Sequence, residues 1–196
     1  MKNKILLGTS NIGKLKEFRF YLEYFKLFPD YKFQTLTDFK NIREPVENGK
    51  SFEENASIKS NFFYKSTNLK CLCDDSGFIV DELKNFPGIK TARVAKKLGN
   101  EQKVIKHIFS KFKNKSELKA TFFCALALIG EGEKFICLGK VSGKVIPESR
   151  GKRGFGYDPF FIPTHQHKTF AEMDREEKML LSHRFNAFEI LTNQKL

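Results

Sequence analysis

Residues 4–28 read KILLGTSNIGKLKEFRFYLEYFKLF, and the hydrophobic pattern changes its period within this stretch. The apolar run at 4–8 has the length of a short buried strand, and the polar residues after it predict a loop. A helix is predicted over 14–28, because apolar side chains recur there at the spacing of one helix face: Leu15, Phe18, Leu22 and Phe25. A strand, a loop and a helix in this order are typical of the opening unit of an α/β fold.

The remainder of the chain continues this alternation of strands and helices. Further strands are expected at 31–37, 69–73, 119–129, 134–141 and 160–162, and helices at 51–66, at 92–113 and around 187–191. Ser51 with Glu54 fits the capping-box pattern of a helix start, and Thr169 with Glu172 fits it a second time. The alternation predicts an α/β fold with a mixed sheet, and no repeat or linker divides the chain.

The composition excludes several classes of protein. Hydrophobic residues make up 40% and charged residues 30% of the 196 residues, which is ordinary for a globular protein and unlike a disordered one. No apolar run reaches the roughly 18 residues of a membrane span, and the apolar stretch near the N-terminus is too short for a secretion signal. We therefore expect a cytoplasmic protein with no membrane partner.

The net charge of +12, from 35 Lys and Arg against 23 Asp and Glu, implies an anionic partner. Nucleic acid, a membrane surface and a phosphorylated small molecule all fit this charge, and so do lysines dispersed over the surface for solubility. The motifs have to decide among these alternatives.

The cysteines and histidines do not predict a metal centre or a disulfide framework. Cys71 and Cys73 form a C-x-C pair, and no two cysteines have the C-x2-C spacing of a zinc site. All four cysteines lie in apolar runs, which favours buried, reduced thiols. His165 and His167 form an H-x-H pair in a polar loop without a third ligand of the same kind nearby.

The first motif that carries chemistry lies between the first strand and the first helix, at residues 8–14. Gly8, Gly13 and Lys14 match the P-loop pattern, but Leu15 stands where a P-loop needs Ser or Thr to hold Mg²⁺. A polar, glycine-containing turn at a helix N-terminus nevertheless offers free N–H groups, a positive dipole end and a lysine. This turn therefore suits phosphate groups, although an ordinary strand-to-helix turn remains the alternative.

The second motif is Asp74-Asp75-Ser76-Gly77, where the strand at 69–73 is expected to end. The carboxyl ends of strands are where α/β proteins bind their ligands. Side chains alternate across a strand, so one Asp could face a ligand site and bind a divalent cation or activate water, while the other anchors the turn. A plain acidic turn is the alternative.

The third motif is Gly154-Phe155-Gly156-Tyr157-Asp158-Pro159. An aromatic ring in it could stack on a base, and Asp158 or the nearby backbone could bond the base's edge. The alternative is a glycine-rich turn before a strand.

The fourth motif comprises Lys178 and Ser182-His183-Arg184. On one unbroken helix, Lys178 and His183 would point about 140° apart, at 100° per residue. If both contact one ligand, the helix has to break between them, and Ser182 suits the N-cap of a new helix. His183 and Arg184 would then lie in a first turn, where cations are unfavourable unless an anion binds. A solvated basic helix face is the alternative.

Taken together, the motifs resemble those of the inosine triphosphatase, or dITP/XTP pyrophosphatase, family of enzymes that clean the nucleotide pool. The resemblance spans residues 9–184, with the motifs in the family's order. The residues that carry it are Thr9-Ser10-Asn11, Lys14, Glu17, Ser51-Phe52, Glu54-Asn55-Ala56, Lys59, Asp74-Asp75-Ser76-Gly77, Pro87-Gly88, Ala92-Arg93, Gly154–Pro159, Glu177-Lys178 and Ser182-His183-Arg184.

This resemblance implies a single domain over residues 1–196, with two lobes, an elongated central mixed sheet flanked by helices, and an active-site cleft between the lobes. It implies a homodimer and Mg²⁺-dependent hydrolysis of a purine nucleoside triphosphate to the monophosphate and pyrophosphate. The expected substrates are the deaminated nucleotides ITP, dITP and XTP.

The resemblance also assigns roles to single residues. Asp75 would be the catalytic proton acceptor and a magnesium ligand, and Ser76 would contact the substrate. The triphosphate would be held by Thr9, Ser10, Asn11, Ile12, Gly13 and Lys14. The nucleoside would be held by Phe155, Gly156, Tyr157, Asp158, Lys178, His183 and Arg184. Lys14, Lys178 and Arg184 would also neutralise phosphate charge.

Two positions depart from the family's pattern. Many members carry Glu-Glu-x-Gly before the loop glycine, whereas this chain has Val46-Glu47-Asn48-Gly49. Either Glu47 takes the metal-ligand role that belongs to the first glutamate, or the metal relies on Asp75, phosphates and water. Ser10 stands where many members have Gly, which reduces backbone freedom near the phosphates.

Two other functions are weighed against this one. A P-loop NTPase would release orthophosphate, and Leu15 argues against that class. A basic RNA-binding protein would fit the charge, but the sequence has no RNP-type aromatic strand and no long basic run. We therefore expect no specific nucleic-acid partner.

Overall fold

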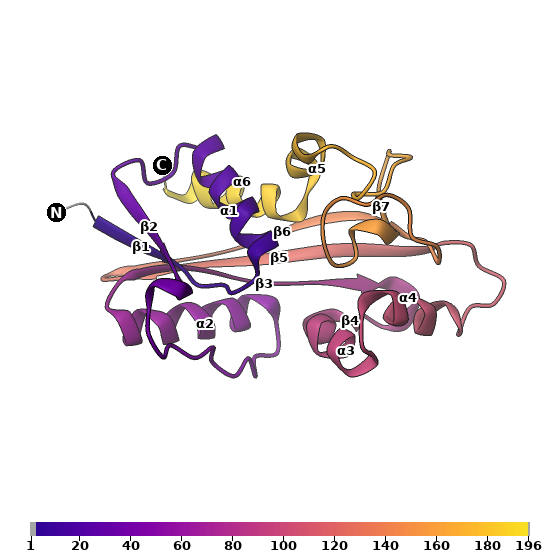
Figure 1. Ribbon diagram of the computed structural model, residues 1–196, viewed down its shortest axis with the longest axis horizontal. Coiled ribbons are helices and arrows are strands. Elements are labelled where there is room, and N and C mark those ends of the chain that lie inside the picture. Colours follow the sequence, from indigo (N-terminus) through magenta and orange to yellow (C-terminus); the bar gives the residue numbers. More distant parts are fainter. Residues whose placement is uncertain (1–2, 196) are drawn as a thin grey trace. The chain divides into compact units, whose positions relative to one another are not determined.

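The computed structural model describes residues 3–195, and the side chain of Lys195 is not described. It consists of a mixed sheet with helices on both sides (Figure 1). The strands are β1 (Asn3–Leu7), β2 (Tyr31–Thr35), β3 (Lys70–Val80), β4 (Phe86–Pro87), β5 (Leu118–Gly130), β6 (Glu133–Val145) and β7 (Phe161–Pro163). The α-helices are α1 (Ile12–Tyr24), α2 (Phe52–Thr67), α3 (Thr91–Leu98), α4 (Glu101–Phe109), α5 (Arg175–Leu181) and α6 (His183–Lys195).

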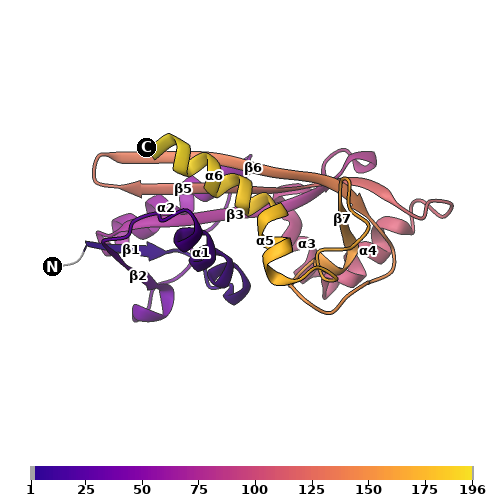
Figure 2. The same cartoon turned by 90° about the horizontal axis from the view of Figure 1, so that it is seen from above.

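The sheet has the strand order β2-β1-β3-β5-β6-β7, and β4 pairs with β3 outside this path. Strand β1 runs parallel to both β2 and β3, whereas the pairs β3–β4 and β6–β7 are antiparallel. Figure 2 shows β5 and β6 side by side along their length. The prediction of an α/β fold with a mixed sheet is therefore confirmed.

The described chain divides into two compact units. Within residues 3–195, unit 1 comprises the residues up to Asp75, Cys124–Gly139 and the residues from Arg184 onward, and unit 2 comprises Ser76–Phe123 and Lys140–His183. Strands β3, β5 and β6 contribute residues to both units. Among residues 3–195, no helix is both long and apolar enough to cross a membrane.

Unit 1 has α2 on one side of its strands and α1 with α6 on the other (Figure 1). Strand β1 ends in three fully buried residues, as its continuous apolar pattern predicts. The rings of Phe18 on α1 and Phe188 on α6 meet edge to face, with centroids 5.3 Å apart. Aromatic packing therefore joins the first and last helices of the chain.

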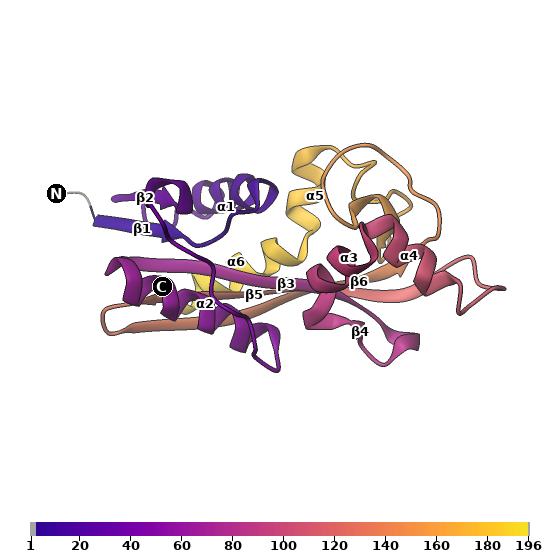
Figure 3. The same cartoon turned by 60° about the horizontal axis from the view of Figure 1, so that its bottom comes forward.

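Unit 2 has α3 and α4 packed side by side, and Figure 3 shows them together beside β4. The buried face of α4 consists of Val104, Ile105, Ile108 and Phe109. These side chains join a phenylalanine-rich core in which the Phe122 and Phe161 ring centroids lie 4.6 Å apart.

Four expectations about element boundaries are wrong. The strand expected to end at residue 73 continues through Asp74 and Asp75 as β3. The helix expected over 92–113 is two helices, because Gly99 has a φ of +108° and Asn100 caps α4 by accepting a hydrogen bond from the Lys103 N–H.

The third wrong expectation is a helix start at Thr169. The Glu172 carboxylate does accept a hydrogen bond from the Thr169 N–H, at 2.7 Å, but residues 170–172 form only a turn. The helix begins later, where Asp174 caps α5 by accepting from the Glu177 N–H. The first helix is also shorter than expected, since α1 ends at Tyr24.

Candidate active site

The loop between β1 and α1 is closely packed against β3. The Gly8 N–H donates to the Leu72 carbonyl at 2.9 Å, and a Cβ at Gly8 would overlap the Cys73 sulfur and the Phe63 ring. Glycine is therefore required where the loop leaves the sheet.

Side chains of the same loop hold the N-terminus of α1. The Asn11 carboxamide oxygen accepts from the Lys14 N–H at 3.1 Å, and the Thr9 hydroxyl accepts from the Asn11 N–H at 3.2 Å. Ser10, Asn11 and Ile12 are exposed. The loop thus presents a capped helix N-terminus to solvent, with the positive end of the helix dipole behind it.

Asp74 is fully buried on β3 and lies among three cations. Its Oδ2 is 2.9 Å from Lys14 Nζ and 3.7 Å from Arg184 Nε, and its carbonyl oxygen accepts from Lys59 Nζ at 3.0 Å. Burial opposes ionisation of Asp74, but Lys14, Arg184 and Lys59 outweigh it and lower its pKa to about 2. Asp74 is therefore a fixed negative charge that positions Lys14.

Asp75 follows Asp74 in the strand, and its electrostatic environment is the opposite. Its Oδ2 accepts from the Asn55 Nδ2 at 3.0 Å. Burial raises the Asp75 pKa to about 6, and the nearby Glu47 charge adds to this effect, while Asn55, Lys59 and Lys14 oppose it. The Asp75 carboxylate is therefore more basic than an ordinary one, as a proton acceptor near neutral pH should be.

Glu47 and Lys59 form an ion pair beside these carboxylates, with 2.5 Å between Oε1 and Nζ. Burial disfavours the charged form of Lys59, but Asp74, Glu47 and Asp75 together raise its pKa above the ordinary value. Val46 is 81% exposed and has no ligand atom in its side chain. In the described part of the chain, no cluster of three or more His, Cys, Asp or Glu side chains could hold a metal ion.

Arg184, the second residue of α6, lies inside unit 1 and is 3% exposed. Its Nη1 lies 2.8 Å from the Glu17 Oε2, and Glu17 is equally buried on α1. Burial disfavours the charged guanidinium, yet Glu17 and Asp74 raise the Arg184 pKa above its ordinary range. Glu17, Arg184 and Asp74 thus form a continuous chain of buried charges that ends at the half-buried Lys14.

In unit 2, the glycine-rich turn is organised around the Asp158 carboxylate. Asp158 Oδ2 accepts from the Phe155 N–H at 2.7 Å and from Lys178 Nζ at 2.7 Å. Gly154 has a φ of +76°, and a Cβ there would overlap this carboxylate. Only glycine allows the turn to close over Asp158.

The Phe155 ring is half-buried and lies over the Lys178 ammonium, 4.6 Å from the ring centroid to Nζ. Asp158 and Phe155 together therefore hold a buried lysine in one position. The turn ends in a Tyr157 ring that packs against Phe78 in the core, with centroids 4.3 Å apart.

His183 is also buried, and its ring stacks on Phe122 with centroids 4.9 Å apart and an angle of 15° between the planes. The chain breaks between Lys178 and His183 as predicted, because Ser182 is extended and separates α5 from α6. The break leaves both side chains buried in unit 2.

The predicted site residues therefore fall into two groups. In unit 1, Asp75, Glu47, Arg184 and residues 9–14 gather around the buried charges. In unit 2, Asp158 holds Phe155 and Lys178, Ser76 is half-buried on β3, and Gly156 is exposed with a φ of +64°.

Two residues of this network had no role assigned from the sequence: Glu17 and Asn55. Helix spacing offered only an indirect signal for them: Glu17 lies one turn after Lys14 on α1, and Asn55 lies one turn before Lys59 on α2, so each shares a helix face with a lysine of the network.

Comparisons with known proteins identify the family of the chain. The family model described as the Ham1 family matches residues 5–194. A protein named dITP/XTP pyrophosphatase from Bacillus anthracis is 37% identical over 96% of this chain and 94% of its own length. One of the same name from Bacillus subtilis is 38% identical over 95% of this chain and 94% of its own length.

Two solved structures have the same fold. The Staphylococcus aureus Ham1 protein superposes with a TM-score of 0.85 at 32% identity, and a HAM1 protein from Coxiella burnetii with 0.85 at 35%. Each comparison covers 98% of both chains. With a family match over nearly all of its residues and relatives above 30% identity along its length, the chain belongs to the Ham1 family.

Proposed function

We propose that this protein hydrolyses deaminated purine nucleoside triphosphates, namely ITP, dITP and XTP, to the monophosphate and pyrophosphate. The observation that carries the proposal is Asp75, a buried carboxylate with a pKa raised to about 6, in a chain whose relatives are named dITP/XTP pyrophosphatases. A carboxylate of this basicity can accept the proton of an attacking water at neutral pH.

The residues of the β1–α1 loop hold the triphosphate in this proposal. Ser10, Ile12 and Gly13 would offer backbone N–H groups at the start of α1, whereas the N–H groups of Thr9 and Asn11 already bond within the loop and shape it. Lys14 adds a positive charge that Asp74 holds in place. A triphosphate is already activated, so positioning and charge neutralisation account for most of its catalysis.

Asp75 and Glu47 fit a magnesium site. Mg²⁺ prefers oxygen ligands and commonly binds through one or two carboxylates together with substrate phosphates. The Glu47 charge raises the Asp75 pKa, which is a repulsion that a divalent cation relieves. When bound there, Mg²⁺ would neutralise phosphate charge, and Lys59 already neutralises part of the charge on both carboxylates.

The residues of unit 2 have the nucleoside as their proposed ligand. Asp158, Lys178 and the Phe155 ring are held in one arrangement by their mutual contacts, and this supports a rigid recognition surface. A buried donor facing O6 would favour 6-oxo purines, because it lacks an acceptor against the amino group of adenine, at a cost of about 1–3 kcal/mol. The other proposed contacts are Ser76, Gly156, Tyr157, His183 and Arg184.

Product analysis across nucleotides tests the function. With Mg²⁺, the protein should convert ITP or XTP to monophosphate and pyrophosphate at least about tenfold faster than ATP or GTP, a ratio that corresponds to about 1.4 kcal/mol. Orthophosphate as the product would support a P-loop NTPase instead, and equal turnover of ATP and ITP would refute the base selectivity. The Asp75→Asn variant should lose nearly all activity and keep the fold.

The same proposal extends to assembly and location. As in the family that the chain resembles, we place it in the cytoplasm, and we propose a single domain over residues 1–196 and a homodimer. Light scattering should then give twice the 22.7 kDa of one chain, and a mass of one chain would refute the dimer.

A further inference from the structure

The excess positive charge of the chain is concentrated in one segment. Residues 84–119 contain eleven Lys and Arg residues against two Glu, a net charge of +9 out of the +12 of the whole chain. The segment includes α3, α4 and the loop between α4 and β5, all within unit 2. A uniform lysine bias would spread this charge along the chain, and it does not explain the concentration.

All eleven basic side chains of this segment are exposed, and we call their surface the basic face. The structure pairs only one of the eleven, Lys115, with a carboxylate, that of Glu82 at 3.0 Å. The basic face consists of Lys84, Lys90, Arg93, Lys96, Lys97, Lys103, Lys106, Lys111, Lys113, Lys115 and Lys119.

The local structure explains why these side chains point outward. On α4, the apolar residues face the core, so that Lys103 and Lys106 share the opposite side one turn apart. On α3, Lys96 and Lys97 are exposed in the last turn, while Thr91 and Ala95 are buried. Helices α3 and α4 pack side by side (Figure 3), so the exposed cations of the two helices belong to neighbouring parts of unit 2.

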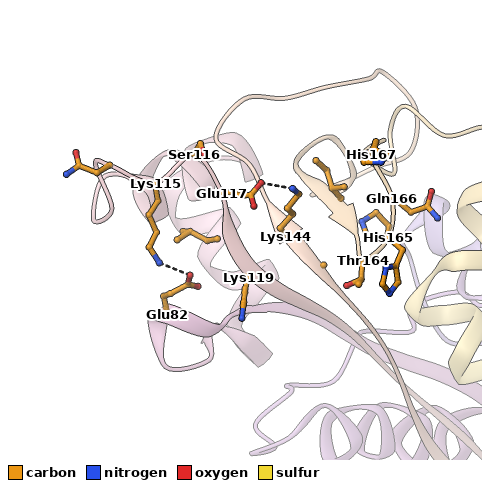
Figure 4. Close-up of a pocket in the computed structure, with 15 residues that line it drawn as sticks. Glu82, Lys115, Ser116, Glu117, Lys119, Lys144, Thr164, His165, Gln166 and His167 are labelled. Atoms are coloured by element: carbon orange, nitrogen blue, oxygen red, sulfur yellow. Dashed lines mark hydrogen bonds and ion pairs between the residues drawn. The ribbon is translucent and has the colours of Figure 1, made fainter.

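A groove of about 1000 Å³ adjoins the end of the basic face (Figure 4). Lys115 and Lys119 belong to both, and the loop after β7 adds His165 and His167. Two carboxylates also line the groove, and each is paired: Glu82 with Lys115, and Glu117 with Lys144 at 2.6 Å. The charges of these pairs cancel, so the groove continues the basic face without reversing its sign.

The chemistry of the basic face distinguishes among anionic partners. Peripheral membrane proteins usually insert apolar side chains, but the large hydrophobic residues that are exposed in residues 3–195 (Ile12, Tyr24, Val46 and Phe62) all lie in unit 1. Single-stranded nucleic acid is usually bound by stacking bases on exposed aromatic rings. Of the three phenyl rings of the segment, Phe109 is buried in the core, and Phe86 and Phe112 are half-buried beneath the ammonium groups of Lys111 and Lys115.

We propose that the basic face and its groove bind the phosphate backbone of a nucleic-acid duplex, independently of sequence. Exposed lysines without aromatic platforms suit evenly spaced phosphates, and a duplex has one charge per about 1.7 Å of its axis. This binding is a second property of the chain, independent of its proposed hydrolytic activity.

The number of contacts sets the expected salt dependence. A rigid duplex can meet about half of the eleven cations at once, which gives about five phosphate contacts. The logarithm of the affinity should then fall against the logarithm of the salt concentration with a slope of about −4.5. The affinity should therefore fall about 100-fold between 50 and 150 mM salt.

The test measures fluorescence anisotropy of a labelled 20-base-pair DNA duplex of random sequence with the full-length protein. The triple variant Lys96→Glu, Lys106→Glu, Lys113→Glu should weaken binding at least about tenfold at 50 mM salt. The control Lys32→Glu, Lys40→Glu, Lys65→Glu makes the same change in net charge at exposed lysines of unit 1 and should stay within about twofold of wild type.

A third variant makes the groove more positive, whereas the first triple variant makes the basic face less positive. Replacing Glu82 and Glu117 by Gln removes the two paired carboxylates, and binding should tighten. Equal losses in the two triple variants would reduce the effect to bulk charge and overturn the proposal. The absence of duplex binding at 50 mM salt would overturn it too.

Two competing probes complete the test. Tighter binding of a 20-nucleotide single strand, or of vesicles containing 30% phosphatidylserine, would assign the basic face to another partner. Circular dichroism shows whether the variants fold. The rate of ITP hydrolysis should be the same in both triple variants and in the wild type. Because hydrolysis and duplex binding are measured separately, a failure of the proposed function can be told apart from a failure of this proposal.

Discussion

Replacing Asp75 by Asn should stabilise the metal-free protein at pH 8. The pKa of Asp75 rises from an ordinary 3.8 to about 6 in the folded chain, a difference of about 2 units. At 1.36 kcal/mol per unit, ionising this carboxylate costs the fold about 3 kcal/mol. The carboxamide of Asn has nearly the same shape, remains neutral, and can still accept the hydrogen bond from Asn55.

The sign of the pH dependence follows from the direction of the shift. Because the native Asp75 holds its proton more tightly than the unfolded chain does, the wild-type protein loses this stability as the pH rises from about 4 to 6. The Asn variant lacks this loss. The difference between variant and wild type should therefore be small near pH 4 and reach about 3 kcal/mol at pH 8, or about 6–12 °C in Tm for a chain of this size.

Urea unfolding at both pH values, followed by circular dichroism with EDTA present, measures this difference. Asp74→Asn provides the matched control, because its pKa is lowered to about 2 and its removal leaves Lys14 and Arg184 without their shared partner. That variant should lose about 2 kcal/mol at pH 8. If Asp75→Asn were no more stable than wild type at pH 8, the proposed strain at Asp75 would be refuted. Added Mg²⁺ should stabilise the wild type and not the Asn variant.

Three further substitutions test other parts of the two groups. Gly154→Ala should lower the free energy of unfolding in urea by about 1–2 kcal/mol more than Gly132→Ala does. Both glycines have a positive φ, but only a Cβ at Gly154 would overlap Asp158, and equal losses would contradict this. Glu17→Gln should cost about 3 kcal/mol in the same assay, because it leaves a buried guanidinium short of its partner; an unchanged midpoint would contradict this. Lys178→Met should raise KM for ITP, measured by pyrophosphate release, and an unaltered KM would argue against a substrate contact.

Local patterns predicted the elements whose determinants lie close together in the chain. The break at Ser182 is an example, because a capping residue and two cations in a first turn conflict with a continuous helix. Gly99-Asn100 carried an equally local signal for the break between α3 and α4, and the apolar periodicity on both sides concealed it.

The residues that allow β3 to continue through Asp74 and Asp75 lie far from the strand in the sequence. Two aspartates inside a strand are unfavourable unless their charges have partners, and those partners, Lys14 and Asn55, lie 60 and 20 residues earlier in the chain. The partner of Arg184 is 167 residues away, at Glu17. No window of sequence contains such pairs, so the roles of Glu17 and Asn55 required the structure.

The discontinuity of unit 1 constrains how the protein can be made. Its three segments are separated by those of unit 2, and the third of them, which begins at Arg184, is synthesised after all of unit 2. Until α6 emerges from the ribosome, Glu17 lacks the guanidinium that pairs with it, and Asp74 lacks one of its three cations. The nascent chain therefore cannot complete the charge network around Lys14 before α6 is made, and deletion of residues 184–196 should deprive residues 3–75 of their native packing.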